Sequence, residues 1–266
     1  MKKFPWLAPD KRVGMTEKEY QEYEVKRRDE DEFIAKSYAF RETVYCLNGA
    51  NGETIWKNES DSHYTRFPQS GSPTVANGKL YVLGAGRNVR CFDALTGKDV
   101  GTVKLTGDFR VEFWQACFVV EDGLAVCLCG HLIALDIKDG SIVWEGDPKT
   151  TNGSHASPVL WKHEETSYVV SNVGRGETAC FELKTGQEVW RVKSEAGVAT
   201  PVIAGNRLIT YGNSRKKGLR CFVMSKTFAE HIWTFNGCQD KGLSLIHISE
   251  PTRRTPISYA VVCLKK

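Results

Sequence analysis

A long internal repeat constrains this chain more than any other feature. The glycines at the tight turn of four successive copies are 45, 43 and 46 residues apart: Gly52, Gly97, Gly140 and Gly186. A fifth, degenerate copy begins at Leu219, and its Trp233 lies 43 residues after Trp190. Self-similarity sustained at a period of about 40–45 residues indicates one supersecondary unit per repeat.

Each period reads as four short strands, a, b, c and d. In two copies, Asn77-Gly78 and Asp122-Gly123 separate apolar runs, which predicts two-residue hairpin turns between strands a and b. No part of the repeat region has helical periodicity. The pattern therefore predicts an all-β protein, a β-propeller of four-stranded antiparallel blades. Because the first copy has only strands c and d, we expect an incomplete ring of one half-blade plus about four blades.

A tryptophan follows the turn glycine by four residues in most copies. It is found as Trp56, Trp144 and Trp190, and as Trp233 in the fifth copy. A buried indole removes about 150–250 Å² of apolar surface from water, so one ring per blade suffices to dock neighbouring blades. Gly101 takes the tryptophan position in the second copy, where we expect the docking point to be missing.

The turn sequences CFDALTGKDVG, ALDIKDGSIVW and CFELKTGQEVW resemble the tryptophan-docking motif of PQQ-binding-like (quinoprotein-type) β-propellers. The resemblance covers residues 44–235 and implies a ring of seven or eight blades. That family includes alcohol and sugar dehydrogenases. It also includes a branch of non-catalytic outer-membrane barrel-assembly lipoproteins, and many of its members are exported or periplasmic.

Cysteine usage favours thiols over disulfides or zinc ligands. The chain has nine cysteines and no Cys-x-x-Cys. Cys46, Cys91, Cys180 and Cys221 occupy one equivalent position of strand c, where Ala134 stands in the third copy. A position shared with alanine needs a small apolar residue, so we expect four buried thiols.

The last 24 residues have no counterpart in any repeat. Read as codons, LSLIHISEPTR and ISYAVVCL match the two constant parts of a translated sequencing-library adapter, except for a one-base difference at the codon of Val262. Arg254-Thr255-Pro256, which lies between them, corresponds to the index barcode. We expect residues 243–266 to be a non-native tail and residues 44–242 to be a truncated propeller fragment. An unusual C-terminal strand is the alternative. Without this tail's four basic residues and one acidic residue, the formal net charge falls from +4 to +1, which gives no reason to expect nucleic acid as a partner.

Residues 1–43 form an extension of different composition. Thr16-Glu17-Lys18-Glu19 is a capping box before a strongly helix-forming, charged segment. Tyr20, Tyr23, Phe33 and Ile34 predict a narrow apolar stripe on that helix. We expect a solvated helix, with a partner-binding helix as the alternative. The start has no apolar signal-peptide core, and no run in the chain is long enough to span a membrane, so the compartment stays open.

The strand order places the b–c and d–a loops on one face of the propeller, which is the better candidate for function. Its candidate binding residues are Arg87, Arg110, Trp114, His155, Arg175, Arg215 and Lys216. Each has an ordinary interpretation too, since basic loops are usually solvated and a loop histidine or tryptophan often packs. The sequence has no Ser-His-Asp spacing, phosphate-binding glycine loop or cluster of metal ligands, so we predict no catalytic or metal-binding residues.

Catalysis in the resembled dehydrogenases makes specific demands on the chain. The resemblance implies PQQ stacked between a tryptophan and a disulfide of adjacent cysteines, with calcium polarising the quinone. No Cys-Cys pair exists here, although glucose-type members also lack it. We favour a non-catalytic binding or assembly scaffold without cofactor, whose loop face binds a protein or an extended ligand. The alternatives are a fragment of a PQQ-dependent alcohol or sugar dehydrogenase, with PQQ and calcium, and a glycan- or solute-binding propeller.

Overall fold

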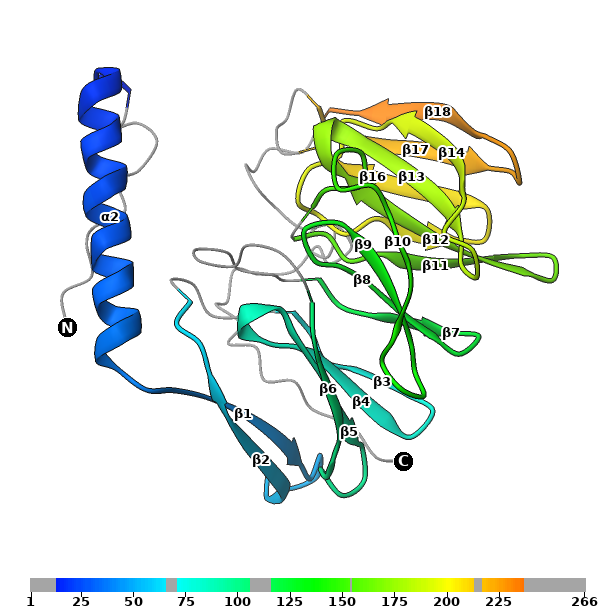
Figure 1. Ribbon diagram of the computed structural model, residues 1–266. Helices are drawn as coiled ribbons and strands as arrows, with labels where there is room; N and C mark the ends of the chain where they lie inside the picture. Colours follow the sequence, from blue (N-terminus) through cyan, green and yellow to red (C-terminus); the bar gives the residue numbers. More distant parts are fainter. Residues whose placement is uncertain (1–12, 66–70, 106–115, 154, 213–216, 237–266) are drawn as a thin grey trace.

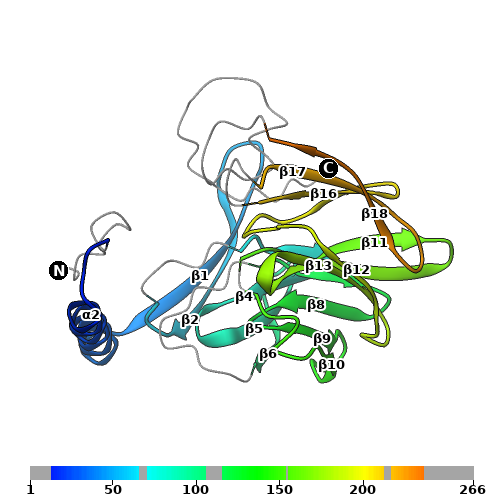
Figure 2. The ribbon, with the colours of Figure 1, turned by 90° about the horizontal axis from the view of Figure 1, so that it is seen from above.

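The structure is a chain of antiparallel sheets preceded by one long helix. The computed structural model describes residues 13–65, 71–105, 116–153, 155–212 and 217–236. Helix α2 (Glu17–Ser37) leads into a two-stranded sheet of β1 (Phe40–Leu47) and β2 (Thr54–Ser62), and four four-stranded sheets follow. The sheets lie side by side in an arc, and α2 stands apart from them in both views (Figures 1 and 2). The predicted half-blade plus four blades is confirmed.

Each complete sheet contains four consecutive strands paired in chain order. The second sheet has β3 (Thr74–Ala76), β4 (Lys79–Leu83), β5 (Asn88–Asp93) and β6 (Asp99–Lys104). The third has β7 (Val119–Glu121), β8 (Leu124–Leu128), β9 (Leu132–Asp136) and β10 (Ile142–Glu145). The fourth has β11 (Val159–His163), β12 (Thr166–Val173), β13 (Glu177–Glu182) and β14 (Glu188–Lys193). The fifth has β15 (Val202–Ala204), β16 (Arg207–Tyr211), β17 (Leu219–Met224) and β18 (Ala229–Phe235).

The tight turns have the chemistry that the sequence predicted. Asn77 and Gly78, which join β3 to β4, have φ of 51° and 73°, so both central residues adopt the left-handed conformation that a two-residue hairpin requires. In the turn between β5 and β6, the Asp93 carboxylate accepts hydrogen bonds from the Thr96 hydroxyl and the Thr96 amide, both at 2.8 Å. These bonds lower the pKa of Asp93. These bonds stabilise the turn between β5 and β6.

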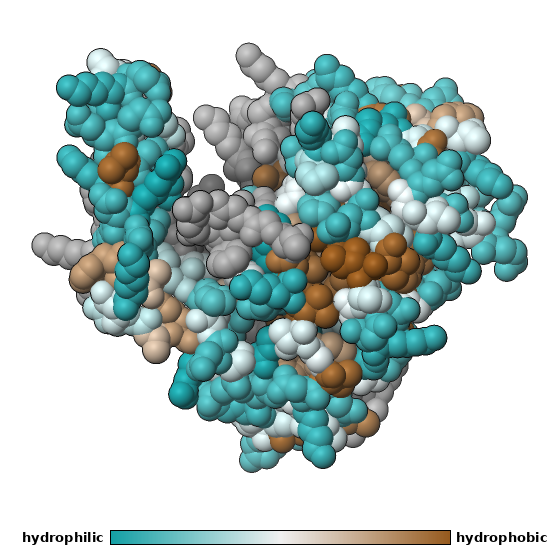
Figure 3. Space-filling view, in the orientation of Figure 1, coloured by the Kyte–Doolittle hydropathy of each residue, from teal (hydrophilic) through white to brown (hydrophobic). Residues whose placement is uncertain are grey.

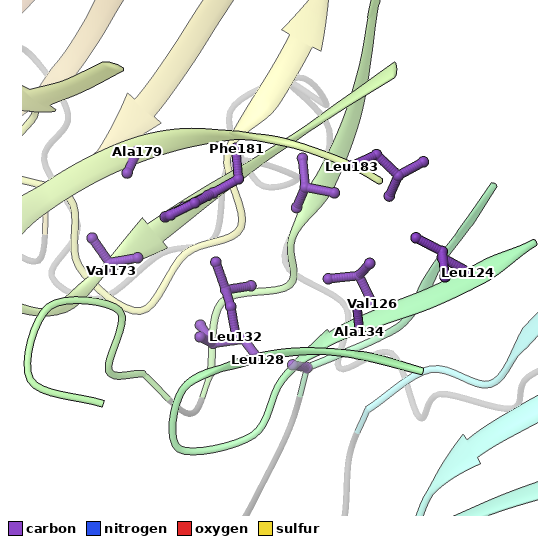
Figure 4. Close-up of a cluster of buried hydrophobic side chains, with 11 residues drawn as sticks. Leu124, Val126, Leu128, Leu132, Ala134, Val173, Ala179, Phe181 and Leu183 are labelled. Carbon is purple, nitrogen blue, oxygen red and sulfur yellow. The ribbon is translucent and has the colours of Figure 1, made fainter. Parts of the chain in front are cut away.

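The core lies between the sheets rather than inside any one of them. Figure 4 shows Leu124, Val126 and Leu128 of β8 directed toward Phe181 and Leu183 of the fourth sheet. The alternate residues of β8 pack on the other side, against the second sheet. Every residue of β8 is buried, because neighbouring sheets cover both of its faces. This explains why the strands read as continuous apolar runs.

The repeated tryptophans lie at the junctions between sheets. Trp56 Nε1 donates to Ala94 O of the second sheet at 3.1 Å, and Trp144 Nε1 donates to Leu183 O of the fourth at 2.8 Å. Each ring also lies over the turn glycine of the next sheet, where a Cβ on Gly186 would come within 2.5 Å of the Trp144 ring. A glycine is required there both for its positive φ and for this close approach.

The two later tryptophans lie in different environments. Trp190 is buried against the fifth sheet, but its Nε1 has no hydrogen-bond partner among the described residues. At the other junctions the acceptor carbonyl lies in the c–d turn of the next sheet, and for Trp190 this is the degenerate turn of the fifth copy. Trp233, on the outer strand of the fifth sheet, is 42% exposed.

Helix α2 begins as predicted but buries a different stripe. Thr16 Oγ1 accepts from the Glu19 amide at 3.3 Å, and the Thr16 amide donates to Glu19 Oε2 at 2.8 Å. The buried residues are Tyr23, Arg27, Asp31 and Ile34, at helical spacing. The predicted stripe was therefore wrong in part, since Phe33 is 65% exposed. Figure 3 shows a largely hydrophilic helix surface, and no helix in the described ranges is long and apolar enough to cross a membrane.

The four equivalent cysteines are not equally buried. All seven described cysteines are thiols outside disulfides, and Cys180 and Cys221 are buried as expected. Cys46 and Cys91 are only half-buried, which corrects the prediction for these two. Cys91 pairs across the ladder with Gly101, which has no side chain to cover it, whereas Cys180 pairs with Trp190. Cys46 lies on β1, a strand with only one neighbour among the described strands.

Candidate functional site

The longer loops come together on one face of the sheets. Strands β4 and β5 are joined through a 3-10 turn, η1 (Ala85–Arg87), and β12 and β13 through η2 (Gly174–Gly176). Arg87 has a φ of 61°, a conformation uncommon outside glycine. The connections between successive sheets reach the same face, because each sheet contains an even number of strands. This loop face is the candidate functional surface.

A cavity of about 230 Å³ opens on the loop face between the third sheet, the fourth sheet and the segment that follows the fourth. Its walls come from the end of β8, the segment between the third and fourth sheets, the η2 turn, and the segment after β14. Four glycines line it: Gly153, Gly174, Gly176 and Gly197. Glycine exposes its backbone and lets another chain approach closely, so much of this surface is main chain.

Two side chains on the cavity rim supply most of its chemical character. His155 lines the cavity and is partly desolvated, and burial lowers its pKa below the ordinary value for histidine. The imidazole is therefore neutral at pH 7 and can both donate and accept a hydrogen bond. Val198, which also lines the cavity, is 52% exposed. The rim thus combines one uncharged polar ring with one accessible apolar side chain.

A buried polar network supports the cavity from below. Asn172 Nδ2 donates to Ala199 O at 2.7 Å, and Asn172 Oδ1 accepts from Thr178 Oγ1 at 2.7 Å. Ser194 Oγ lies 2.7 Å from Thr178 Oγ1 and donates to it, because the Thr178 proton is used on Asn172, while the Ser194 amide donates to Gly176 O at 3.0 Å. The side chains of Asn172, Thr178 and Ser194 are buried. A satisfied network of this kind holds η2 and the segment after β14 in one arrangement.

The structure brings only some of the predicted binding residues to this cavity. His155 lines it, and the backbone of Arg175 lies in η2 between two lining glycines. Arg87 is buried in η1. Its guanidinium lies against Gly130 in the loop of the next sheet, so close that a Cβ added to Gly130 would lie 2.8 Å from Arg87 Nη2. The remaining four predicted residues lie outside the described ranges: Arg110, Trp114, Arg215 and Lys216.

Sequence reasoning missed two asparagines of the site. Asn172 supports the cavity and Asn152 lies against Gly174, where its backbone oxygen accepts from the Gly174 amide at 2.7 Å. A signal for Asn172 was present, because Ser171-Asn172 interrupts an apolar strand just before its loop. A buried polar residue in such a place must find partners, which points to a network at the loop. Asn152 gave no comparable signal.

The described part of the loop face offers no ligand set for calcium. No group of three His, Cys, Asp or Glu side chains comes together as a metal site among the described residues. Calcium takes six to eight oxygen ligands, usually with several carboxylates. A metal site built from three or more such side chains is therefore not found in the described part of the chain.

Comparison with known families agrees with the repeat analysis. The profile of the family described as outer membrane protein assembly factor BamB matches residues 41–162 and 130–253, well over half of the chain. The chain belongs to this family. The second match extends past residue 242, the predicted end of the propeller, and that boundary stays a prediction. Members of the BamB family are built from PQQ-like β-propeller repeats of the kind seen here.

The individual relatives are of two kinds, a quinone-dependent alcohol dehydrogenase and BamB. The quinone-dependent alcohol dehydrogenase subunit of Gluconobacter oxydans is 26% identical over 186 residues, which are 60% of this chain and 24% of that protein. The structure of BamB from Moraxella catarrhalis superposes with a TM-score of 0.55 at 17% identity, covering 72% of this chain and 55% of the other.

A quinohemoprotein alcohol dehydrogenase from Comamonas testosteroni has the same TM-score at 14% identity, covering 74% and 40%. The chain thus spans about a quarter of the dehydrogenase subunit and about half of the BamB chain. At these identities the two structures show the β-propeller fold alone.

Proposed function

We propose that this chain is a non-catalytic β-propeller scaffold whose loop face binds a segment of a protein partner. The observation that carries the proposal is the size and lining of the loop-face cavity. At about 230 Å³ it is smaller than the roughly 300–1,000 Å³ of a typical ligand pocket. A volume of that kind accepts one anchoring side chain, as the central pocket of a protein interface does.

The cavity lining favours an extended polypeptide with an apolar anchor. The four glycines let a partner backbone lie against the loops, and Val198 offers apolar contact beside the opening. His155, neutral at pH 7, places an uncharged polar ring beside that apolar contact. Membership in a family described as an assembly factor also supports a protein partner.

Site-specific photo-crosslinking in cells tests the proposal. A photoreactive residue replaces Val198 on the loop face, and in a matched control it replaces Leu95 in the β5–β6 turn on the opposite face, which is 69% exposed. We expect a defined protein crosslink from position 198, absent at 95 and weakened by His155→Ala. Equal crosslinking from both positions, or none from 198, contradicts the proposal.

The second candidate function is a segment of a quinone-dependent dehydrogenase. The 26% identity to the Gluconobacter oxydans subunit is the observation that favours it. Titration of the chain with PQQ and calcium decides between the two. A shift of the quinone absorbance together with alcohol- or sugar-dependent dye reduction supports the dehydrogenase. An unshifted quinone spectrum supports the scaffold.

A further inference from the structure

The first sheet has an edge that no described strand covers. In the four complete sheets, strand c is paired on both sides, as β5 is with β4 and β6. Strand β1 is the equivalent strand, with Cys46 at the position of Cys91, and it pairs with β2 alone among the described strands. Its other edge therefore presents a row of backbone groups toward the inside of the arc.

The backbone groups on that edge are identified by the alternation of the strand. The Asn48 amide donates to Glu53 O across the β1–β2 hairpin at 2.8 Å. Because successive residues point their backbone groups to opposite edges, Thr43, Tyr45 and Leu47 face the uncovered edge. In the complete second sheet the equivalent edge is used, and Asn88 O accepts from the Gly84 amide at 2.8 Å.

A cavity of about 470 Å³ lies beside this edge. β1 forms one wall, and Leu80 and Val82 of β4 contribute apolar side chains to the other. At the next junction the equivalent space is filled, because Tyr81 and Leu83 of β4 pack into a shared core with the third sheet. The cavity therefore occupies the place that strand b fills in a complete sheet.

A buried guanidinium in the same cavity lacks one hydrogen-bond acceptor. Arg90 lines the cavity and is 5% exposed. Its Nη2 donates to Asn58 Oδ1 at 2.8 Å and to Asp99 Oδ1 at 3.2 Å, but Nη1 is buried without an acceptor among the described residues. A buried charged donor left unpaired is costly, so the junction between the first and second sheets is incompletely satisfied as it stands.

We propose that this cavity is a strand-addition site that accepts a β-hairpin of the a–b kind seen in the other four sheets. Strand b of the hairpin pairs with Thr43, Tyr45 and Leu47, and its apolar side chains pack on Leu80 and Val82. A hairpin fits better than a lone strand, because the cavity also extends to Gly71 and Pro73, just before the innermost strand of the second sheet. Main-chain hydrogen bonds supply the affinity and the apolar positions supply the selection.

Amide hydrogen exchange with a defined probe tests this proposal. The probe is a cyclised peptide with the sequence of residues 72–84, which contains the β3–β4 hairpin. The control peptide carries lysine at the positions of Tyr81 and Leu83, whose counterparts in the bound hairpin face the second sheet. At a peptide concentration of ten times Kd, exchange at Tyr45 and Leu47 should slow about tenfold, with Phe92 unchanged.

Two outcomes of the exchange experiment overturn the proposal. In one, Tyr45 and Leu47 are already as protected as Phe92 in the chain without peptide, so the edge is occupied. In the other, the control peptide protects them equally, so the apolar wall does not select the occupant.

A pair of proline variants adds a test that does not depend on the peptide's own folding. Proline is tolerated on an open edge but not where a ladder hydrogen bond is needed. Thr43→Pro should keep the melting transition of the chain and abolish protection by the peptide. Val44→Pro, one residue along and paired with Asn58 of β2, should lower the melting midpoint. If Thr43→Pro destabilises as much as Val44→Pro, the edge is already paired and the proposal fails.

Discussion

Lys79 Nζ donates to Ile137 O at 2.8 Å, across the junction between the second and third sheets. Ile137 lies three residues before the turn glycine Gly140, the position whose carbonyl accepts an indole N–H at the Trp56 and Trp144 junctions. At this junction Gly101 stands in the tryptophan position, and Val103 packs against Gly140 instead. An ammonium and a valine thus replace the indole, so the docking point expected to be missing is built from other residues.

Removing the ammonium should weaken this junction. Lys79→Met keeps most of the apolar stem but leaves the Ile137 carbonyl without its donor. We expect a loss of about 1–3 kcal/mol in the free energy of unfolding, measured by urea denaturation. Lys98→Met, at an exposed lysine in a turn of the same sheet, is the control and should change little. A Lys79→Met variant as stable as the parent would show that water replaces the ammonium without cost.

A tryptophan restored at position 101 should recover part of that loss. A Cβ at Gly101 meets nothing within 4 Å, so a side chain can leave the backbone there without a clash. In the parent, Gly101→Trp competes with Lys79 for one carbonyl and should have little effect on the urea midpoint. In the Lys79→Met background it should be stabilising, which a double-mutant cycle measures as a coupling energy. Equal effects in the two backgrounds would contradict a shared acceptor.

The tryptophans should differ in what their removal costs. Trp144 packs on Gly186 and donates to Leu183 O, so Trp144→Ala should lower the free energy of unfolding by about 3–5 kcal/mol. Trp233 is partly exposed on the outer strand of the fifth sheet, and Trp233→Ala should cost much less. Calorimetric melting of both variants checks the contrast. Similar losses would mean that the junction contact is not what stabilises Trp144.

The repeat predicted the sheets because its signals are local. Asn77-Gly78 specifies a two-residue turn, and Asp93 with Gly97 specifies the c–d turn, whatever the rest of the chain does. The tryptophan spacing placed Trp56 and Trp144 at junctions for the same reason. These features depend on residues within one period, so a single sequence is enough to read them.

What could not be predicted depends on contacts between periods. Lys79 reaches Ile137 across a junction 58 residues along the chain, and nothing in the local sequence of Lys79 marks it as a docking residue. Arg87 looked like a loop cation available for binding, yet it is buried over a glycine of the next sheet. The stripe on α2 was misjudged because the surroundings of a helix, rather than its own pattern alone, decide which side is covered.

Thiol labelling should separate the cysteines by their burial. Burial raises the pKa of Cys180 and Cys127 well above the ordinary value, so little reactive thiolate forms in the folded chain. Cys46 and Cys91 are half-buried and should react faster, with Cys91 slowed by a raised pKa. Mass spectrometry after timed alkylation gives the order, and all should react alike in urea. Labelling of Cys180 as fast as Cys46 in the folded chain would contradict the burial.

Acid should destabilise the fold through His155 before it does so through the carboxylates. Burial lowers the pKa of the folded imidazole, whereas in the unfolded chain it titrates near about 6.5. The unfolded state therefore binds more protons below that pH, so the contribution of His155 is complete above about pH 6.5 and is lost as the pH falls.

Urea midpoints measured from pH 7.5 to 5 should decline, and His155→Gln, which cannot ionise, should flatten the decline. The Asp93 and Asp139 carboxylates have lowered pKa values, so their effect on stability appears only at more acidic pH. Between pH 7.5 and 5 these two carboxylates therefore do not mask the effect of the imidazole on the urea midpoint. An unchanged slope in His155→Gln would show that the ring is solvated in the folded chain, and the neutral rim assigned to the loop-face cavity would be wrong.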